Sequence, residues 1–476
     1  MSTLKHKAIN ATKWNIIDIV LSNAINFLSI IYLANILKPK DFGLLAVLAV
    51  MTSLANVIIN SGFFQALVHK GKEITNDDCK TVFTVNILIS TSLYSILVLS
   101  SELIANFYES IELKGIIYVL FTSIIFNSVT VVHRAKLSID MNFSYQAKIN
   151  VIASLVSSIT GMWLGYIGFG YWALVSIILT KSIVCTILYS VSSEWKIKFG
   201  FCYKSFKELF SYGSKLFLAS IINTITLNLS NLIIGKLFSI KELGYYNQAQ
   251  SYSNLLSNNI VAVTQKVTFP LFSSIKNDRK RVRSIYEQIL TISTFISVPI
   301  VIGFASISNE FVLVFLNESW RPAVDLLAIL CVAKSISPIS MFNINLISAL
   351  GNSGLVLKID TLKMVLAVGV IYVTSKISLN AVAMGQVLLS LVFYVMNAIP
   401  NKKHIGLGLF NQIKIIYKIY LSASIMYIIN TSFHLDCVYL SMFIKVVLGI
   451  FVYISSCYLL KVNVLRNLYW NFKNRA

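Results

Sequence analysis

Ionisable residues inside long apolar segments are the side chains of this sequence best placed to do chemistry. Asp18 lies in the first apolar segment, and Lys181 and Lys334 lie near the middle of two others. An unpaired charge is costly in an apolar environment, so such residues mark candidate sites for an ion, a proton or a charged ligand. The two lysines would attract an anionic group. Asp18 either takes up a coupling ion, H⁺ or Na⁺, or forms structural hydrogen bonds.

Other ionisable residues allow both a functional and a structural interpretation. Lys215 and Lys266 lie near the ends of apolar segments, where their ammonium groups either contact a ligand or extend to lipid headgroups. Arg134 ends another apolar segment and could add to a cationic site. Asp360 and Lys363 are spaced so that one helix face holds both, and we expect them to neutralise each other.

Two apolar segments, residues 211–238 and 243–272, carry an unusual density of side-chain amides. The amides that we expect to face a polar cavity are Asn228, Asn231, Asn247, Gln250 and Asn254. Hydrogen bonds between neighbouring helices would account for a few such residues, whereas so many favour helices that line a water-filled cavity. These amides would bind sugar hydroxyl groups with little selectivity.

Motifs of enzymes and of metal sites are missing from the sequence. The five histidines do not cluster, the six cysteines include no Cys-x-x-Cys pair, and no phosphate-binding glycine loop is present. Asp77 and Asp78 directly precede an apolar segment, where a helix cap is favoured over a metal site. The sequence therefore predicts no catalysis, no cofactor and no metal ion.

Hydrophobic residues make up 56% of the chain and recur in segments of about 20 residues, the length that crosses a bilayer. The sequence therefore predicts an all-α integral membrane protein with about fourteen transmembrane helices. The expected spans are residues 14–37, 42–64, 82–104, 113–133, 149–169, 171–193, 211–238, 243–272, 285–307, 324–350, 355–375, 378–399, 411–431 and 437–460. No loop between them is long enough for a separate catalytic domain.

The net charge of +21 is distributed unevenly along the chain. If the N-terminus is cytoplasmic, the loops on that side hold most of the Lys and Arg residues, as the positive-inside rule requires. Both termini are therefore expected in the cytoplasm. Topology and contact with anionic membrane lipids explain the basic excess, so nucleic-acid binding is not expected.

A short polar junction occurs twice in the sequence. Residues 40–43 (KDFG) follow the first span, and residues 241–244 (KELG) follow the seventh. A weak repeat of this length is typical of transporters built from two related halves. We expect a six-helix lobe at residues 1–193, a cytoplasmic connector at 194–210, a pseudo-symmetric six-helix lobe at 211–400, and two further helices with a basic tail at 401–476.

An ordered series of short motifs resembles the polysaccharide flippases, the Wzx or polysaccharide-transporter branch of the exporter superfamily that also contains MATE and MurJ-type proteins. The motifs are residues 37–44 (LKPKDFGL), 142–143 (NF), 168–175 (GFGYWALV), 231–236 (NLIIGK), 243–246 (LGYY), 269–272 (FPLF), 298–299 (VP) and 320–323 (WRPA). Each motif is weak alone, whereas the ordered set is fairly specific and covers residues from about 10 to 400.

The resemblance implies a transporter that moves a polyprenyl-diphosphate-linked oligosaccharide across the bacterial cytoplasmic membrane by alternating access. The product would be O-antigen lipopolysaccharide, capsule or exopolysaccharide, and a polysaccharide polymerase would be a partner. The last two helices would cradle the lipid tail. Members often carry an acidic residue where this chain has Ser230, which leaves Asp18 as the main candidate for ion coupling.

Three other functions stay open. A MATE-like drug or cation exporter would favour carboxylates inside the membrane, whereas the deep charges here are mainly lysines. A membrane glycan polymerase or ligase would normally carry a large external loop with catalytic residues. The sequence does not distinguish an active transporter from a passive scramblase or a scaffold.

Overall fold

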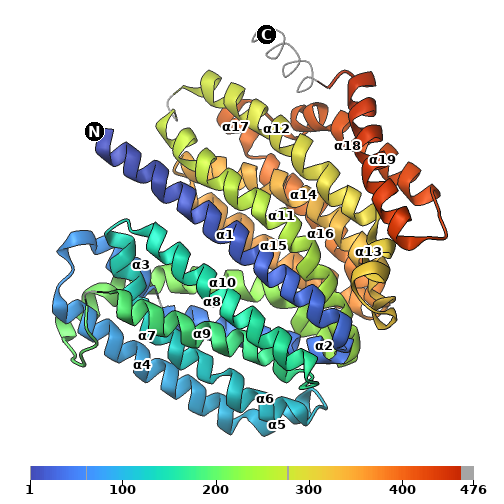
Figure 1. The fold of residues 1–476 in the computed structure, drawn as a ribbon. Coiled ribbons are helices and arrows are strands. Elements are labelled where there is room, and N and C mark those ends of the chain that lie inside the picture. The colour runs from blue at the N-terminus through green and yellow to red at the C-terminus, as the bar shows by residue number, and fades with distance from the viewer. Residues whose placement is uncertain (1, 61, 194, 276–277, 463–476) are drawn as a thin grey trace. The chain divides into compact units, whose positions relative to one another are not determined.

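The computed structural model describes residues 2–60, 62–193, 195–275 and 278–462, which form helices and no strand (Figure 1). Among these residues, eleven helices are long and apolar enough to cross a membrane. Three others, α10 (Tyr203–Leu237), α11 (Ile240–Ser274) and α15 (Ser353–Ser375), have comparable lengths but are not among the eleven. An all-α membrane protein is therefore confirmed, whereas the count of fourteen spans stays a prediction.

The chain divides into two compact units, Met1–Gly244 and Tyr245–Ala476. Before α10, the helices of the first unit are α1 (Ser2–Ile36), α2 (Pro39–Asn60), α3 (Phe63–Lys70), η1 (Gly71–Glu73), α4 (Asn76–Leu99), α5 (Ser101–Phe107), α6 (Glu112–Leu120), α7 (Thr122–Ile139), α8 (Phe143–Tyr166) and α9 (Trp172–Ser192). Within this unit, α8 packs against both α1 and α9, and α7 packs against α4 and α9.

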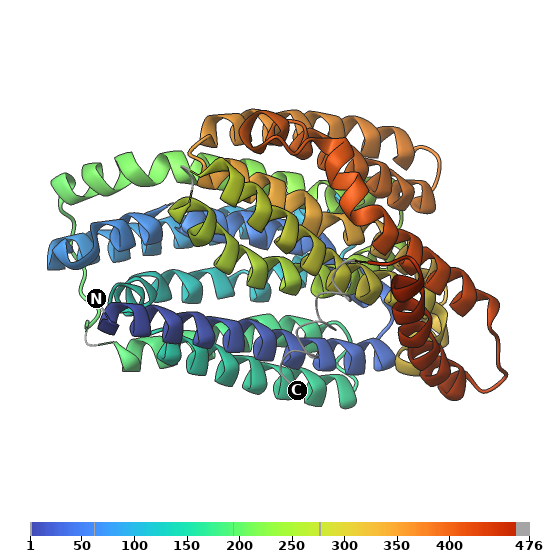
Figure 2. The ribbon, with the colours of Figure 1, turned by 90° about the horizontal axis from the view of Figure 1, so that it is seen from above.

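The second unit contains most of α11 and the helices that follow it. Besides α15, these are α12 (Arg279–Ser306), α13 (Ser308–Phe315), η2 (Glu318–Trp320), α14 (Ala323–Ala349), α16 (Leu379–Ala398), α17 (Asn401–Ile405), α18 (Leu409–Ser432) and α19 (Val438–Leu459). α14 packs between α12 and α16, and α18 packs against α12 and α19. Within this unit α19, dark red, lies at the edge (Figure 2).

The boundary between the units lies later than the connector at residues 194–210 that the sequence suggested. α10 belongs to the first unit because it packs along α2 and also contacts α3 and α4. The predicted lobes at residues 1–193 and 211–400 rest on the sequence repeat rather than on these contacts, and they stay a prediction.

Helix starts follow local sequence signals. The Thr75 side chain accepts a hydrogen bond from the Asp78 backbone N–H at 3.2 Å, and the Asp78 carboxylate accepts one from the Thr75 N–H at 2.9 Å. This reciprocal pair is a capping box, which satisfies backbone N–H groups that the helix leaves free. The cap predicted for Asp77 and Asp78 is thus confirmed for Asp78, which is the third residue of the helix, with Thr75 as the N-cap.

The repeated junction folds in the same way in both copies. The Asp41 carboxylate accepts a hydrogen bond from the Lys38 N–H at 2.9 Å, and the Glu242 carboxylate accepts one from the Ser239 N–H at 3.0 Å. Each acidic residue therefore caps the helix that starts at the junction, α2 in the first copy and α11 in the second.

Two glycines bring these helix starts into direct backbone contact. A Cβ atom on Gly43 would overlap the Ile240 carbonyl, and one on Gly244 would overlap the Pro39 carbonyl. Gly43 contacts Ile240, which lies four residues before Gly244, and Gly244 contacts Pro39, which lies four residues before Gly43. The two contacts are therefore equivalent in the two copies of the repeat. We call this contact the glycine crossing. Only glycine allows backbones to approach this closely.

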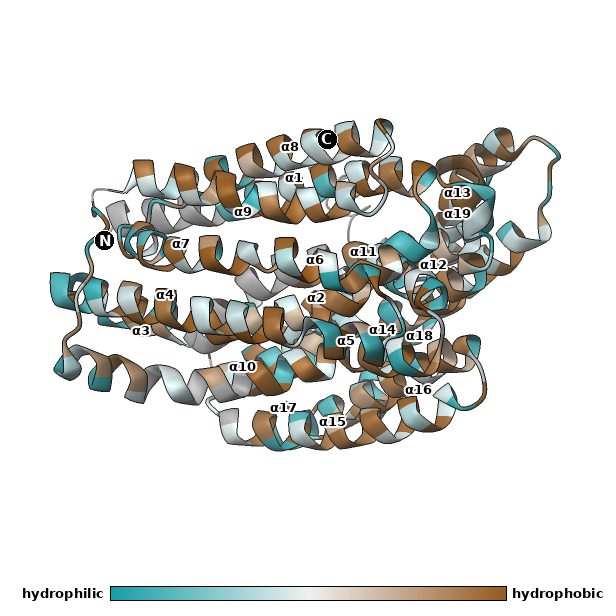
Figure 3. Cartoon of the chain, turned by 90° about the horizontal axis from the view of Figure 1, so that it is seen from below, coloured by the Kyte–Doolittle hydropathy of each residue, from teal (hydrophilic) through white to brown (hydrophobic). Residues whose placement is uncertain are grey.

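Apolar residues recur along the helices of both units (Figure 3). In the second unit a buried cluster around Phe272, Tyr286 and Phe342 joins α11, α12 and α14. A second cluster around Val298, Met426 and Tyr453 joins α12, α18 and α19. The first of these clusters includes Tyr286 and Tyr394, which take part in the buried amide network of this unit described below.

Candidate functional site

A cavity of about 420 Å³ opens inside the first unit. It lies between α1, α7 and α9, and its wall mixes amides, hydroxyls and apolar side chains with one cation. The lining residues are Asn26, Ser29, Ile30, Asn127, Ile177, Ile178, Lys181, Ser182 and Cys185. The volume is that of a pocket for a small ligand or for part of a larger one.

Lys181 provides the positive charge of this cavity. Its side chain is half-buried, and among the described residues it forms neither an ion pair nor a hydrogen bond. An ammonium group in a half-buried cavity interacts more strongly with an anionic ligand than it would in bulk water, because the surrounding protein screens the charge less. The structure thus places Lys181 where an anion can reach it.

Asn127 and Ser29 of the cavity wall are fixed by hydrogen bonds within the first unit. Asn127 donates a hydrogen bond to the Asn56 side chain at 3.1 Å, and Asn56 donates to the Thr52 carbonyl at 2.9 Å. Ser29 shares a hydrogen bond of 3.1 Å with Ser158. These bonds fix α1, α2, α7 and α8 around the cavity.

Asp18 lies on α1 and is held by donors from two helices. Its carboxylate accepts hydrogen bonds from the Ser22 hydroxyl at 3.2 Å and from the Asn150 amide at 2.8 Å. The Asn150 carbonyl oxygen in turn accepts a hydrogen bond from the Tyr189 hydroxyl at 3.2 Å. The carboxylate is thus linked through α8 to α9, the helix that carries Lys181. Sequence reasoning missed Asn150 and Tyr189, although an amide in an apolar segment was a usable signal.

The other cations proposed from the sequence are not gathered in this cavity. Arg134 is exposed, does not line it, and lies 5.4 Å above the Phe64 ring. Lys334 is half-buried on α14 of the second unit, where its backbone carbonyl accepts a hydrogen bond from Ser257 at 3.2 Å. Its ammonium group has no ion pair among the residues that the structure describes. The side chains of Lys215 and Lys266 lie outside the described part of the chain.

The amides of α10 and α11 have mixed surroundings. Asn228 is half-buried and donates to the Thr224 carbonyl of its own helix at 2.9 Å. Asn231 is buried, and its side-chain oxygen accepts no hydrogen bond from any described residue. Asn247, Gln250 and Asn254 are half-buried. No described bond between helices uses these five side chains, so a cavity lined by them stays a prediction.

Asp360 and Lys363, which the sequence predicts to neutralise each other, form an ion pair. The Lys363 ammonium lies 2.9 Å from the Asp360 carboxylate on α15. Their three-residue spacing places both groups on one helix face, which explains the pair without a ligand. The structural interpretation of this pair is confirmed.

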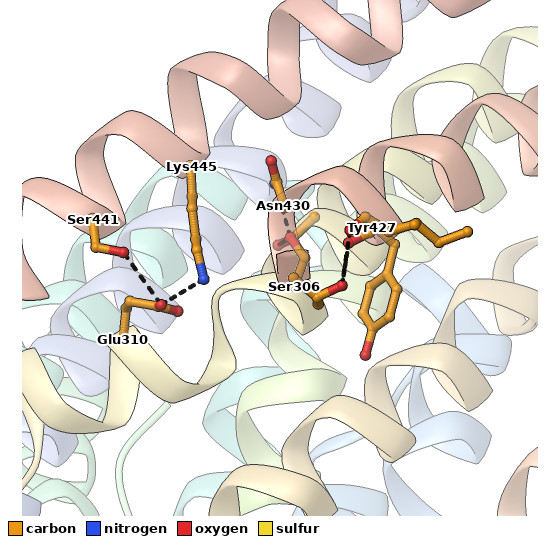
Figure 4. A network of polar contacts seen from close by, with 9 residues as sticks. Ser306, Glu310, Tyr427, Asn430, Ser441 and Lys445 are labelled. Carbon is orange, nitrogen blue, oxygen red and sulfur yellow. Dashed lines mark hydrogen bonds and ion pairs between the residues drawn. The ribbon is translucent and has the colours of Figure 1, made fainter. Parts of the chain in front are cut away.

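A second ion pair lies in the second unit and was not foreseen. The Lys445 ammonium of α19 lies 2.6 Å from the Glu310 carboxylate of α13, and both side chains are at most 6% exposed (Figure 4). Ser441 donates a weaker hydrogen bond of 3.4 Å to the same carboxylate oxygen. The expected spans place Glu310 between two helices and Lys445 inside another, and nothing in the sequence links the two residues.

A buried amide network joins four helices of the same unit. The Tyr286 hydroxyl donates to the Asn343 side chain at 2.9 Å, and Gln412 donates to the same oxygen at 2.9 Å. Tyr394 donates to the Gln412 side chain at 3.3 Å. These residues satisfy one another, so the network fixes α12, α14, α16 and α18 and leaves little capacity for a ligand.

Comparison with known proteins finds relatives that are named as polysaccharide biosynthesis proteins. The teichuronic acid biosynthesis protein TuaB of Bacillus subtilis is 23% identical over 340 residues, which cover 70% of this chain and 69% of TuaB. The lipopolysaccharide biosynthesis protein WzxC of Escherichia coli is 25% identical over 336 residues, which cover 69% of this chain and 67% of WzxC.

A solved structure of the lipid II flippase MurJ, in an inward closed conformation, shares the fold. The TM-score is 0.78 at 16% identity, and the alignment covers 97% of this chain and 100% of MurJ. Residues 32–325, well over half of the sequence, match the family described as polysaccharide biosynthesis protein. The predicted resemblance is confirmed, and the chain belongs to the polysaccharide biosynthesis protein family of membrane proteins.

Proposed function

We propose that this protein flips a polyprenyl-diphosphate-linked oligosaccharide across the bacterial cytoplasmic membrane to supply surface polysaccharide synthesis. The observation that carries the proposal is the Lys181 ammonium, which has no described partner and lies in a cavity lined by amides and hydroxyls. A diphosphate bearing a sugar combines the negative charge and the hydroxyl groups that such a wall binds. The names of the relatives TuaB and WzxC support a substrate of this kind.

The size of the cavity limits which part of the substrate binds there. A volume of about 420 Å³ suits a diphosphate and its first sugar rather than a whole oligosaccharide. Arg134, Lys334, Lys215 and Lys266 would extend the cationic path. The amides of α10 and α11, Asn228, Asn231, Asn247, Gln250 and Asn254, would contact sugar hydroxyls further along it.

Asp18 would couple transport to an ion gradient of H⁺ or Na⁺. Its carboxylate accepts hydrogen bonds from Ser22 of α1 and from Asn150 of α8. Uptake of a proton or a Na⁺ ion would weaken these bonds and loosen α1 from α8. Such a change can bias a transporter between inward and outward states.

The orientation and the downstream partner belong to the same proposal. With both termini in the cytoplasm, the substrate would enter from the cytoplasmic side and leave externally. A polysaccharide polymerase would then consume the exported unit.

Replacing Lys181 tests the proposal directly. Lys181→Gln keeps a polar side chain, one atom shorter, but removes its charge, so we expect surface polysaccharide to fall about tenfold or more at an unchanged protein level. Lys181→Arg should retain part of the activity. The matched control is Lys148→Gln, which removes an exposed lysine on α8 outside the cavity. Wild-type polysaccharide in a Lys181→Gln, Lys334→Gln double variant would overturn the cationic-site proposal.

A further inference from the structure

A segment between α9 and α10 is fixed along the start of α4. We call residues 195–207, which include the first residues of α10, the basic strap. The Trp195 indole N–H donates to the Asn76 side chain at 3.0 Å. The backbone N–H groups of Gly200 and Cys202 donate to the Thr84 and Thr81 hydroxyls at 3.1 Å and 2.9 Å. An otherwise irregular segment thus has a defined position.

The inner side of the basic strap is packed with aromatic rings. Trp195 is 5% exposed, and its ring centre lies 5.7 Å from that of Phe83 and 5.4 Å from that of His133. These contacts bury one side of the strap against α4 and α7, and they determine which residues point outward.

The outer side alternates positive charge with exposed apolar surface. Lys196, Lys198, Lys204 and Lys207 are exposed, and none of their ammonium groups has an ion pair or a hydrogen bond among the described residues. The apolar and aromatic residues between and beside them are Ile197, Phe199, Phe201 and Tyr203, with exposed fractions of 46% to 69%. Phenylalanines so exposed would be unfavourable in water.

The depth of the basic strap follows from the helices that it touches. One membrane-spanning helix ends at Ser192 just before it, and another begins at Asn76, to which the strap is bonded. The strap therefore lies where two spans meet the surface of the bilayer. At this depth aromatic rings partition into the interface and lysines meet phosphate groups.

We propose that the basic strap binds anionic phospholipid headgroups of the leaflet that it faces. The four lysines would contact the lipid phosphates, while Phe199 and Phe201 would insert between the headgroups and the upper acyl chains. Charge complementarity favours an anionic lipid over a zwitterionic one, because a zwitterionic lipid gives no net attraction to the four ammonium groups. This interaction is separate from the proposed transport site and does not depend on its substrate.

Fluorescence quenching in nanodiscs can test the local lipid composition at the strap. Bimane would be attached at Ile197→Cys in the full chain, with Cys202→Ser and Cys437→Ser to remove the other exposed or half-exposed thiols outside the cavity. Nanodiscs would contain phosphatidylcholine and phosphatidylglycerol in equal amounts, with one or the other brominated. We expect brominated phosphatidylglycerol to quench about twofold more strongly than brominated phosphatidylcholine, and the excess to shrink as salt is raised.

Two charge variants make the result specific to the strap. Changing all four strap lysines to Gln should abolish the excess quenching, whereas changing them to Arg should preserve it. The matched control Lys402→Gln, Lys403→Gln removes two exposed lysines of the second unit and should leave it unchanged. Thermal unfolding of each variant checks that the fold is retained.

Equal quenching by the two brominated lipids in the otherwise unaltered strap would overturn the proposal. So would an excess that survives the four Lys→Gln changes. A strap that instead binds an acidic protein partner would give equal quenching, and would be rejected as a lipid site by the same measurement.

Discussion

Charged side chains on the helices of this chain differ in whether the protein itself supplies a partner of opposite charge. Glu310 and Lys445 neutralise each other at 2.6 Å, as do Asp360 and Lys363 at 2.9 Å. Lys181 has no such partner among the described residues, although it lines a cavity. Removing a charge from water costs free energy. In an ion pair the partner within the protein offsets this cost, whereas an unpaired charge needs a bound ion or ligand to offset it. A functional role, the binding of an anionic ligand, therefore best explains why Lys181 lines the cavity without a partner.

The Glu310–Lys445 pair should behave as a buried structural pair. Glu310→Gln or Lys445→Met alone leaves one charge buried without a partner, and each should destabilise the protein by about 3 to 5 kcal/mol. Replacing both with Met should restore most of the lost stability. Thermal unfolding in detergent with a thiol-reactive dye measures this, because Cys79, Cys331 and Cys457 are buried in the folded state. A double variant as unstable as the single ones would contradict a purely structural pair.

Asp18 can be tested apart from its structural bonds. Asp18→Asn keeps the size of the side chain and one oxygen acceptor but cannot exchange a proton, so transport should lose its dependence on the ion gradient. The control Ser22→Ala removes the donor within α1 and leaves both the carboxylate and its bond to Asn150 of α8, so it should keep that dependence. Transport in reconstituted vesicles with and without a pH or Na⁺ gradient is the measurement. Full gradient dependence in Asp18→Asn would mean that Asp18 is structural.

At the scale of elements, the glycine crossing joins the starts of α2 and α11 by backbone contact. Gly43→Ala or Gly244→Ala places a Cβ where a carbonyl now lies, so the contact must open. We expect either change to lower transport about tenfold or more, because crossings of this kind tolerate only glycine.

The control for the glycine crossing is Gly369→Ala in α15. A Cβ there meets no atom within 4 Å, and alanine favours a helix, so transport and stability should be unchanged or improved. Equal transport by the Gly43→Ala and Gly369→Ala variants would show that transport does not require close contact between the starts of α2 and α11.

Local features of these elements could be predicted from the sequence, and spatial ones could not. The Asp78 cap and the Asp360–Lys363 pair follow from spacings of three residues, which fix their geometry. The Glu310–Lys445 pair joins residues far apart in the chain. Hydropathy does not fix the rotation of a helix in a bundle, so it could not show that Lys181 lines a cavity while Arg134 does not.

At the scale of the whole molecule, the native cysteines allow a test of topology. Cys437 is exposed between α18 and α19, predicted to be external, and Cys202 lies in the basic strap, predicted to be cytoplasmic. Hydrogen bonds from Ser205 lower the pKa of the Cys202 thiol, so it should react readily wherever a reagent reaches it. A membrane-impermeant maleimide added to intact cells should label Cys437 and spare Cys202.

Two controls accompany the labelling. Cys437→Ser should abolish the signal from intact cells, and opening the cells should add labelling of Cys202. Labelling of Cys202 in intact cells would reverse the orientation derived from the distribution of Lys and Arg.

The central claim is that the protein moves a lipid-linked oligosaccharide, and the leaflet where that lipid accumulates tests it most directly. Lipid extracts from cells with and without the protein would be compared, with enzymatic access from each side of the membrane reporting the leaflet. We predict that loss of the protein causes one polyprenyl-diphosphate oligosaccharide to accumulate in the cytoplasmic leaflet, and that the wild type but not Lys181→Gln reverses this. Unchanged lipid and surface polysaccharide would contradict the account and favour a drug or cation exporter, for which efflux would be measured next.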